Sequence, residues 1–146
     1  MAVSDWPLEL TREAYGRTLV ELGQENPRIV VLDADLAVST LTKYFRDAFP
    51  DRFFEMGIAE QNMVGVAAGL ARTGKTIFAT TYGVFASRRA YDFAAIACAH
   101  SDVDVKIVAG LPGLTTGYGG THQAIEDLAL MRMIPNLVVI DPCDAV

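Results

Sequence analysis

Residues 52–71 read RFFEMGIAEQNMVGVAAGLA, a short apolar run, a glycine and then a long, almost wholly apolar segment. The first part predicts a strand at 53–56, and the second predicts a helix at 59–72 that is closed by Gly74. A helix without a polar stripe is typically buried on every side. Its first turn holds one ionisable side chain, Glu60. Because a carboxyl group is costly to bury, this position is expected to carry a function.

One face of the predicted helix is nearly bare backbone. Gly65, Ala68 and Gly69 lie at positions i, i+3 and i+4, which share a face of a helix. Such a face lets another helix approach closely. The chain is also 51% hydrophobic, and a surplus of apolar surface is typical of proteins with a partner. We therefore expect another subunit to cover this helix.

The rest of the chain alternates between apolar runs and segments with helical periodicity. Further strands are expected at 28–33, 76–80, 105–109 and 137–140, and further helices at 11–25, 40–48, 84–99 and 123–133. Short, continuous apolar strands that alternate with helices predict an α/β fold, here a three-layer α/β/α domain with a parallel sheet, formed by residues 1–146. In such folds, ligands bind at the carboxyl ends of the strands.

Composition excludes several kinds of partner. The net charge of -6 argues against nucleic acid and against anionic membranes. No run of 18 apolar residues is present, so no membrane span is expected. Cys98 and Cys143 do not have metal-ligand spacing, and no metal site is expected within this chain. The default is a reduced, cytoplasmic setting.

Residues 57–62, Gly-Ile-Ala-Glu-Gln-Asn, resemble the motif in which transketolases and related thiamine diphosphate enzymes carry their activating glutamate. The resemblance extends from Thr11 to Ala145 and implies the pyrimidine-binding domain of these enzymes. It implies that Glu60 bonds the aminopyrimidine ring of thiamine diphosphate, while the cofactor supplies the carbanion chemistry. Without the resemblance, Glu60 reads as a surface residue that interacts with the positive end of the helix dipole.

The resemblance also picks out cofactor contacts. Phe85 and Tyr91 match aromatic residues around the pyrimidine ring, where a flat ring gains from stacking, and Asp35 matches an acid near the cofactor. Taken alone, the two rings are core aromatics and Asp35 caps the next helix. Some transketolases have a third aromatic residue where this chain has Arg88. That change either makes the pocket edge more polar or turns the arginine to solvent.

Three further positions match substrate contacts. Arg12 and Ser39 match residues that hold the phosphate of the sugar, and a guanidinium group can bond a phosphate with two donors. His122, within Thr-His-Gln, matches a histidine that contacts the donor sugar, and a neutral imidazole both donates and accepts hydrogen bonds. Without the resemblance, Arg12 reads as a solvated helix-end residue and His122 as a structural histidine.

The glycine-rich loop at 110–121 departs from the family pattern. Transketolases usually carry Gly-Glu-Asp-Gly before Thr-His-Gln, whereas residues 117–120 read Gly-Tyr-Gly-Gly, which is one residue shorter and lacks an acid. A histidine near the start of the loop is replaced by Leu111. Leu111 and the Tyr118-Gly119 pair therefore alter the substrate half of the site, and the donor ketose and the acceptor stay open.

Residues 69–76, GLARTGKT, fit the pattern of a phosphate-binding P-loop. That loop functions when it follows a strand and opens a helix, whose first amides hold the phosphate. Here the segment closes a helix and leads into a strand. No nucleotide site is expected.

The resemblance implies the pyrimidine-binding part of a thiamine-diphosphate-dependent transketolase, which transfers two-carbon ketol units between sugar phosphates. The Gly-Asp-Gly…Asn motif through which the family's diphosphate domain binds Mg²⁺ (or Ca²⁺) does not occur in residues 1–146, and the family's further C-terminal domain is not expected within them. We expect an inactive isolated chain that needs a diphosphate-binding subunit or domain, in a homodimer or heterotetramer. The alternatives are a deoxyxylulose-phosphate synthase, a dehydrogenase E1 β subunit or a non-catalytic assembly module.

Overall fold

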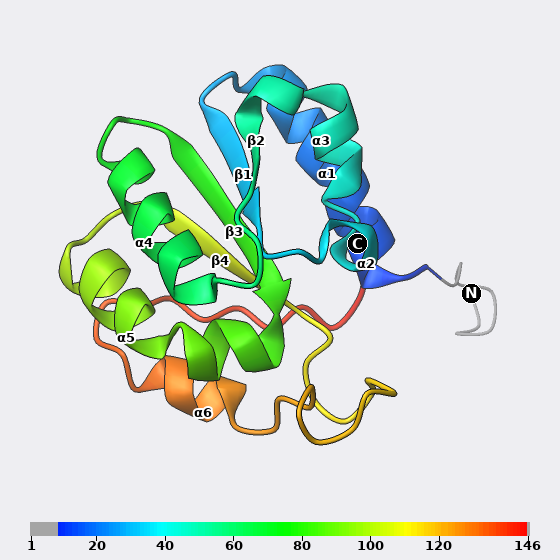
Figure 1. The fold of residues 1–146 in the computed structure, drawn as a ribbon, viewed down its shortest axis with the longest axis vertical. Helices are drawn as coiled ribbons and strands as arrows, with labels where there is room; N and C mark the ends of the chain where they lie inside the picture. Colours follow the sequence, from blue (N-terminus) through cyan, green and yellow to red (C-terminus); the bar gives the residue numbers. More distant parts are fainter. Residues whose placement is uncertain (1–8, 146) are drawn as a thin grey trace, which may run out of the picture.

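A parallel sheet forms the centre of the computed structural model, which describes residues 9–145 (Figure 1). Within these residues the strands are β1 (Ile29–Asp33), β2 (Phe53–Glu55), β3 (Thr76–Tyr82) and β4 (Val105–Gly110). Their spatial order is β2-β1-β3-β4, and every neighbouring pair is parallel. The predicted α/β class and the parallel sheet are confirmed.

Helices cover both faces of the sheet, which confirms the three layers (Figure 1). On one face lie α1 (Thr11–Glu25), α2 (Ala37–Thr40) and α3 (Lys43–Ala48), followed by the 3₁₀ turn η2 (Pro50–Arg52). On the other lie α4 (Glu60–Ala71), the π-helical η3 (Phe85–Arg89), α5 (Tyr91–Phe93), the π-helical η4 (Ala94–His100) and α6 (Asp127–Arg132). No helix within residues 9–145 is both long and apolar enough to cross a membrane.

β1 is apolar along its length because both of its faces are covered. Val31 packs into the cluster that contains Leu19 of α1 and Phe45 of α3. Its neighbour Leu32 points to the opposite face and packs with Met63 of α4. Successive side chains of a strand point to opposite faces, so a strand between two helical layers needs a continuous apolar run.

The predicted helix at 40–48 is wrong in its form, because two short helices, α2 and α3, occupy residues 37–48. Leu41 separates them in the left-handed region, with φ of 63°. The break lets the hydroxyl groups of both Thr40 and Thr42 reach the buried carboxylate of Asp33. This polar contact outweighs the tendency of the segment to continue as one helix.

The predicted helix at 123–133 is shorter in the structure, where α6 begins at Asp127. Ala124 instead forms an antiparallel bridge with Gly113, whose N–H donates to the Ala124 carbonyl at 2.7 Å. The glycine-rich loop is thereby folded back on the segment after His122, and residues 123–126 are used to anchor it.

The predicted strand at 137–140 is wrong. These residues pair with no strand among those described and appear as coil in Figure 1. Leu137 packs beside Ile134, but Val138 and Ile140 are 82% and 80% exposed. An apolar run forms a strand only where a sheet edge supplies hydrogen-bond partners, and the run itself does not reveal whether it meets one.

The prediction that α4 is buried on every side is wrong within this single chain. Gln61, Asn62, Val66 and Gly69 are exposed, although Met63, Val64 and Ala67 are fully buried. Of the small-residue face, Ala68 is buried and Gly65 lies against the Phe93 ring of α5, whereas Gly69 is exposed. That another subunit covers this helix stays a prediction.

Two glycines of α1 allow α3 to pack closely, and one of them gives a stability prediction. A Cβ at Gly23 would lie 2.6 Å from the Phe45 ring and 2.7 Å from the Phe49 ring. Gly23→Ala should therefore lower the free energy of unfolding by about 1–3 kcal/mol through overpacking. Urea denaturation measures the change.

Gly69→Ala is the matched control, because no atom lies within 4 Å of the added Cβ. This variant should gain about 0.5–1 kcal/mol, since alanine restricts the unfolded chain and favours a helix. Equal effects of the two substitutions would contradict the close α1–α3 contact.

Candidate active site

Glu60, the first residue of α4, is only 1% exposed. Its two carboxylate oxygens accept hydrogen bonds from Nη1 of Arg89 at 2.7 and 2.8 Å. The alternative in which Glu60 is a surface residue is therefore excluded. A buried carboxylate needs such a partner, because leaving it unpaired would be very costly.

The loop that leads into α4 is fixed by a second acid. The Oε1 atom of Glu55, at the end of β2, accepts the N–H of Asp35 at 2.7 Å and that of Gly57 at 3.1 Å. Gly57 has a φ of 69°, which favours glycine. These hydrogen bonds join the loops that follow β1 and β2, and they fix the loop from which α4 and Glu60 begin.

Arg89 also covers an aromatic ring of the site. Its Cζ lies 4.3 Å from the centroid of the Phe85 ring, within the range of a cation–π interaction. Both residues belong to η3, a wide turn in which the N–H of Ala90 donates to the Phe85 carbonyl at 3.1 Å. Such π-helical turns are frequent at functional sites.

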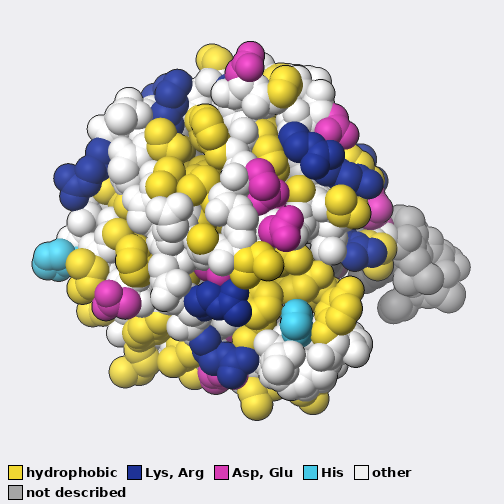
Figure 2. Space-filling model, viewed as in Figure 1, with side chains coloured by type: hydrophobic (Ala, Val, Ile, Leu, Met, Phe, Trp, Pro, Cys, Tyr) yellow, Lys and Arg dark blue, Asp and Glu magenta, His cyan; other side chains and the backbone are white. Residues whose placement is uncertain are grey.

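His122 lies next to the same ring. Its imidazole meets Phe85 edge-on at 5.2 Å and Tyr118 at 5.1 Å, measured between ring centroids. Its Nδ1 is 2.9 Å from the hydroxyl oxygen of Thr121. Figure 2 shows basic side chains beside a hydrophobic area that holds one histidine on this face. Glu60, Arg89, Phe85 and His122 thus form a continuous group, which we call the Glu60 group.

A second group gathers at the end of β1. Nη1 of Arg12 donates to the Ser39 carbonyl at 3.4 Å, so the two residues predicted to hold the sugar phosphate are adjacent. Arg12 is exposed and Ser39 is half-buried. Asp35 is exposed as well and has a φ of 62°, in the loop tied to Glu55.

Tyr91, the second aromatic residue predicted to line the cofactor pocket, does not pack with Phe85. It packs in a separate cluster with Ala94, Ala99 and Ile134. Arg88, at the third aromatic position of the family, is paired with Glu126 at 3.2 Å and has a side chain that is 47% exposed. Arg88 therefore points to a different carboxylate from the one that its neighbour Arg89 holds.

Sequence reasoning missed Arg89. The signal was present, since two arginines follow the aromatic residue predicted to stack on the cofactor. Adjacent residues of a helix point in different directions, and the unknown width of the turn leaves open which of them meets Glu60.

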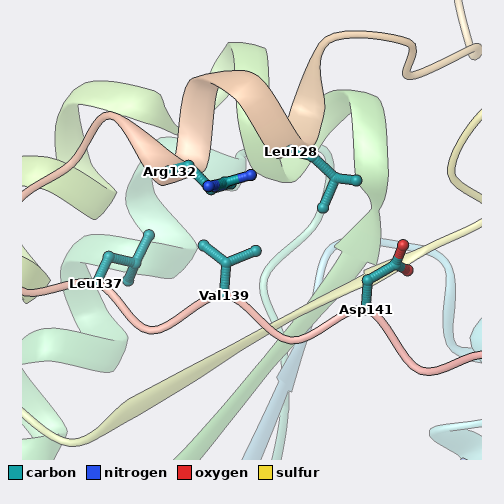
Figure 3. Close-up of a pocket in the computed structure, with 5 residues that line it drawn as sticks. All are labelled: Leu128, Arg132, Leu137, Val139 and Asp141. Carbon is teal, nitrogen blue, oxygen red and sulfur yellow. The ribbon is translucent and has the colours of Figure 1, made fainter.

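A pocket of about 530 Å³ lies elsewhere, between α6 and the segment after it (Figure 3). Leu128 and Arg132 of α6 point toward Leu137, Val139 and Asp141 across it. None of the predicted site residues lines this pocket, and residues of an unpaired segment form one wall.

Comparisons with known proteins identify the family of the chain. Residues 10–146 match the family described as "Transketolase, pyrimidine binding domain". The chain therefore belongs to the transketolase pyrimidine-binding domain family.

Individual relatives are similar over nearly the whole chain. A putative transketolase C-terminal section of Methanocaldococcus jannaschii is 53% identical over 134 residues, which are 91% of this chain and 42% of the relative. A 6-deoxy-6-sulfo-D-fructose transketolase subunit of a Clostridium species is 43% identical over 92% of this chain and 42% of its own length. The chain thus spans about two fifths of these relatives.

A solved structure has the same fold. It is described as a split-gene transketolase in an inactive β4 tetramer. It is 58% identical, with a TM-score of 0.81, and the match covers 92% of this chain and 44% of that one.

Asp33, at the end of β1, is a fully buried acid that is not part of either group. It accepts the Leu36 N–H at 2.6 Å and the hydroxyl groups of Thr40 and Thr42 at 2.9 and 2.8 Å. Burial raises the pKa of Asp33 above its usual 3.8, although these three donors oppose the rise. Asp33 therefore holds α2 and α3 against the sheet, and the free energy that its burial costs depends on pH.

Asp33→Asn should make stability less dependent on pH. Because the folded-state pKa is raised, the folded protein binds this proton more tightly than the unfolded chain. The contribution is fully present below pH 3.8 and is lost as pH rises through the folded-state pKa. Urea denaturation at several pH values from 4 to 7 should show that the free energy of unfolding of the variant increases relative to that of the wild type as pH rises. Parallel pH profiles would contradict this.

Proposed function

We propose that the chain is the pyrimidine-binding part of a thiamine-diphosphate-dependent transketolase that is active only with a diphosphate-binding subunit. One observation carries the proposal. Glu60, a buried carboxylate at the start of α4, is bonded to the guanidinium of Arg89, which also lies on the Phe85 ring. Family membership and the relatives described as a C-terminal section or a split-gene product support it.

The residues present fit an aminopyrimidine ring. An aminopyrimidine ring is flat and carries N–H donors. The guanidinium of Arg89, which contacts both Glu60 and Phe85, has the same two properties. Thr81, near the end of β3, is a further candidate contact. Its buried hydroxyl has no hydrogen-bond partner among the described residues, and such groups are rare unless they serve a purpose.

Thiamine diphosphate, when bound, supplies the carbanion chemistry by which a two-carbon ketol unit is moved between sugars. Glu60 would hold a proton or a hydrogen bond at a ring nitrogen, in a place from which water is excluded by burial. Phe85 would orient the ring by stacking. His122, in contact with Phe85, would hydrogen-bond a hydroxyl group of the donor sugar. Arg12 and Ser39 would hold the anionic end of that sugar.

The diphosphate and its Mg²⁺ (or Ca²⁺) would be bound by the partner. Tyr91 and Asp35 remain proposed cofactor contacts, the first away from Phe85 and the second in the loop after β1. We propose assembly with a diphosphate-binding subunit as a heterotetramer, or as a homodimer if one longer protein carries both parts.

The loop at 110–121 supports a donor other than the usual sugar phosphates. It lacks the family's acid, and the Tyr118 ring, 66% exposed, lies beside His122. One similar relative is described as acting on 6-deoxy-6-sulfo-D-fructose, which ends in a sulfonate. The exposed guanidinium of Arg12 can bond either anion. Donor assays should therefore include this sulfosugar beside xylulose 5-phosphate.

Glu60→Gln should greatly reduce ketol transfer in the assembled enzyme. After reconstitution with the diphosphate-binding subunit, activity should fall about 10²–10⁴-fold, the usual loss when a proton-handling group is removed. The measurement is ketol transfer, with subunit assembly followed by gel filtration.

Glu25→Gln is the control, because Glu25 is exposed at the end of α1, away from the site. It should assemble and react like the wild type. Full activity of assembled Glu60→Gln would refute the proposed function.

His122→Ala should weaken the use of the donor sugar more than the binding of the cofactor. The lost hydrogen bond to a donor hydroxyl should lower kcat/KM about tenfold or more, in line with about 1.5 kcal/mol for such a bond. Steady-state kinetics at saturating thiamine diphosphate measure this. His100→Ala, at an exposed histidine of η4, should leave kcat/KM unchanged.

A further inference from the structure

Arg89 occupies both surfaces that the proposed cofactor ring needs. One of its nitrogens fills both oxygens of Glu60, at 2.7 and 2.8 Å, and its guanidinium lies 4.3 Å from the Phe85 ring. A planar cation with N–H donors, stacked on an aromatic ring and bonded to a carboxylate, makes the same two contacts as an aminopyrimidine ring.

We call Glu60 and Phe85 the pyrimidine site. We propose that Arg89 is an internal occupant of this site, which closes the site in the unassembled chain and leaves it when the aminopyrimidine ring of the cofactor binds. The inference rests on the proposed function of Glu60 and Phe85. It adds a regulatory element to that site: the ring competes with a side chain of the same domain.

The two partners differ in freedom to move. Glu60 is 1% exposed and is held at the start of α4, whereas the Arg89 side chain is 40% exposed. A long arginine side chain at the surface can turn its charged end into water without disturbing the core. Departure of Arg89 would therefore uncover Glu60 and Phe85 together while the backbone stays in place.

The neighbouring arginine shows that this pairing is specific. Arg88 precedes Arg89 and has a similarly exposed side chain, at 47%, yet it pairs with Glu126 at 3.2 Å. The two arginines thus have equal charge and adjacent positions but different carboxylates. Arg88 is accordingly the matched control for Arg89.

Competition of this kind weakens binding by a predictable factor. If the site is open in only a fraction of the molecules, the apparent dissociation constant rises by the inverse of that fraction. A pair that leaves the site open about a tenth of the time makes the ring bind about tenfold more weakly. Removal of the Arg89 guanidinium should therefore lower the apparent dissociation constant of the ring by the same factor.

The test uses 4-amino-2,5-dimethylpyrimidine, the ring half of thiamine, as the probe. Its affinity for the 146-residue chain is measured by NMR titration for wild type, Arg89→Ala and Arg88→Ala. Arg89→Ala should bind about tenfold more tightly than the wild type, and Arg88→Ala should match the wild type. Methylguanidinium should compete with the probe in Arg89→Ala. Arg89→Gln carries the same comparison if Arg89→Ala does not fold.

Three outcomes would overturn the inference, and they differ in what they say of the proposed function. If both Arg89 variants bind the probe no more tightly than the wild type, Arg89 is not an internal occupant of the site. If Glu60→Gln, measured in the same way, then loses the binding, the proposed pyrimidine site itself is still supported. Tighter binding by Arg88→Ala as well would show a general charge effect. Absence of binding in every variant would reject both the inference and the pyrimidine site.

Discussion

β1 is the strand on which the other elements depend, because it is buried along its length and hydrogen-bonded on both sides. It pairs with β2 and β3 in parallel register, and each of its faces is covered by a separate helical layer. All four parallel strands then end at one edge, so the loops after β1, β2, β3 and β4 come together there. This constraint places Ser39, Glu60, Phe85 and His122, which follow the four strands in turn, at a common edge.

Two acids connect that edge to the rest of the fold in different ways. Asp33 is satisfied within one segment, by the Leu36 N–H and by the hydroxyl groups of Thr40 and Thr42, and it serves the local structure. Glu60 is also buried, but its partner is Arg89, which is 29 positions further along the chain and has an exposed side chain. A buried acid with a removable partner can take part in chemistry, whereas one enclosed by fixed donors is suited to holding a loop.

The long elements of the fold followed from local pattern. The continuous apolar run at 29–33 indicates a strand that is covered on both faces, and the long, almost wholly apolar segment at 60–71 before Gly74 indicates a helix. Three predictions failed where residues outside the predicted element decided the outcome. Asp33 divides the helix at 37–48, Gly113 draws residue 124 into a bridge, and the run at 137–140 finds no partner strand.

By itself, the sequence determined the layered α/β fold, the position of Glu60 at the start of an apolar helix and the membership of the chain in a family, since these depend on patterns within short segments. Only the tertiary structure decided that Arg89 rather than Arg88 meets Glu60, that Phe85 contacts His122 and that Tyr91 packs apart from both. The reason is geometric: side-chain contacts depend on the width of a turn and on the packing between elements. Neither can be read from neighbouring residues.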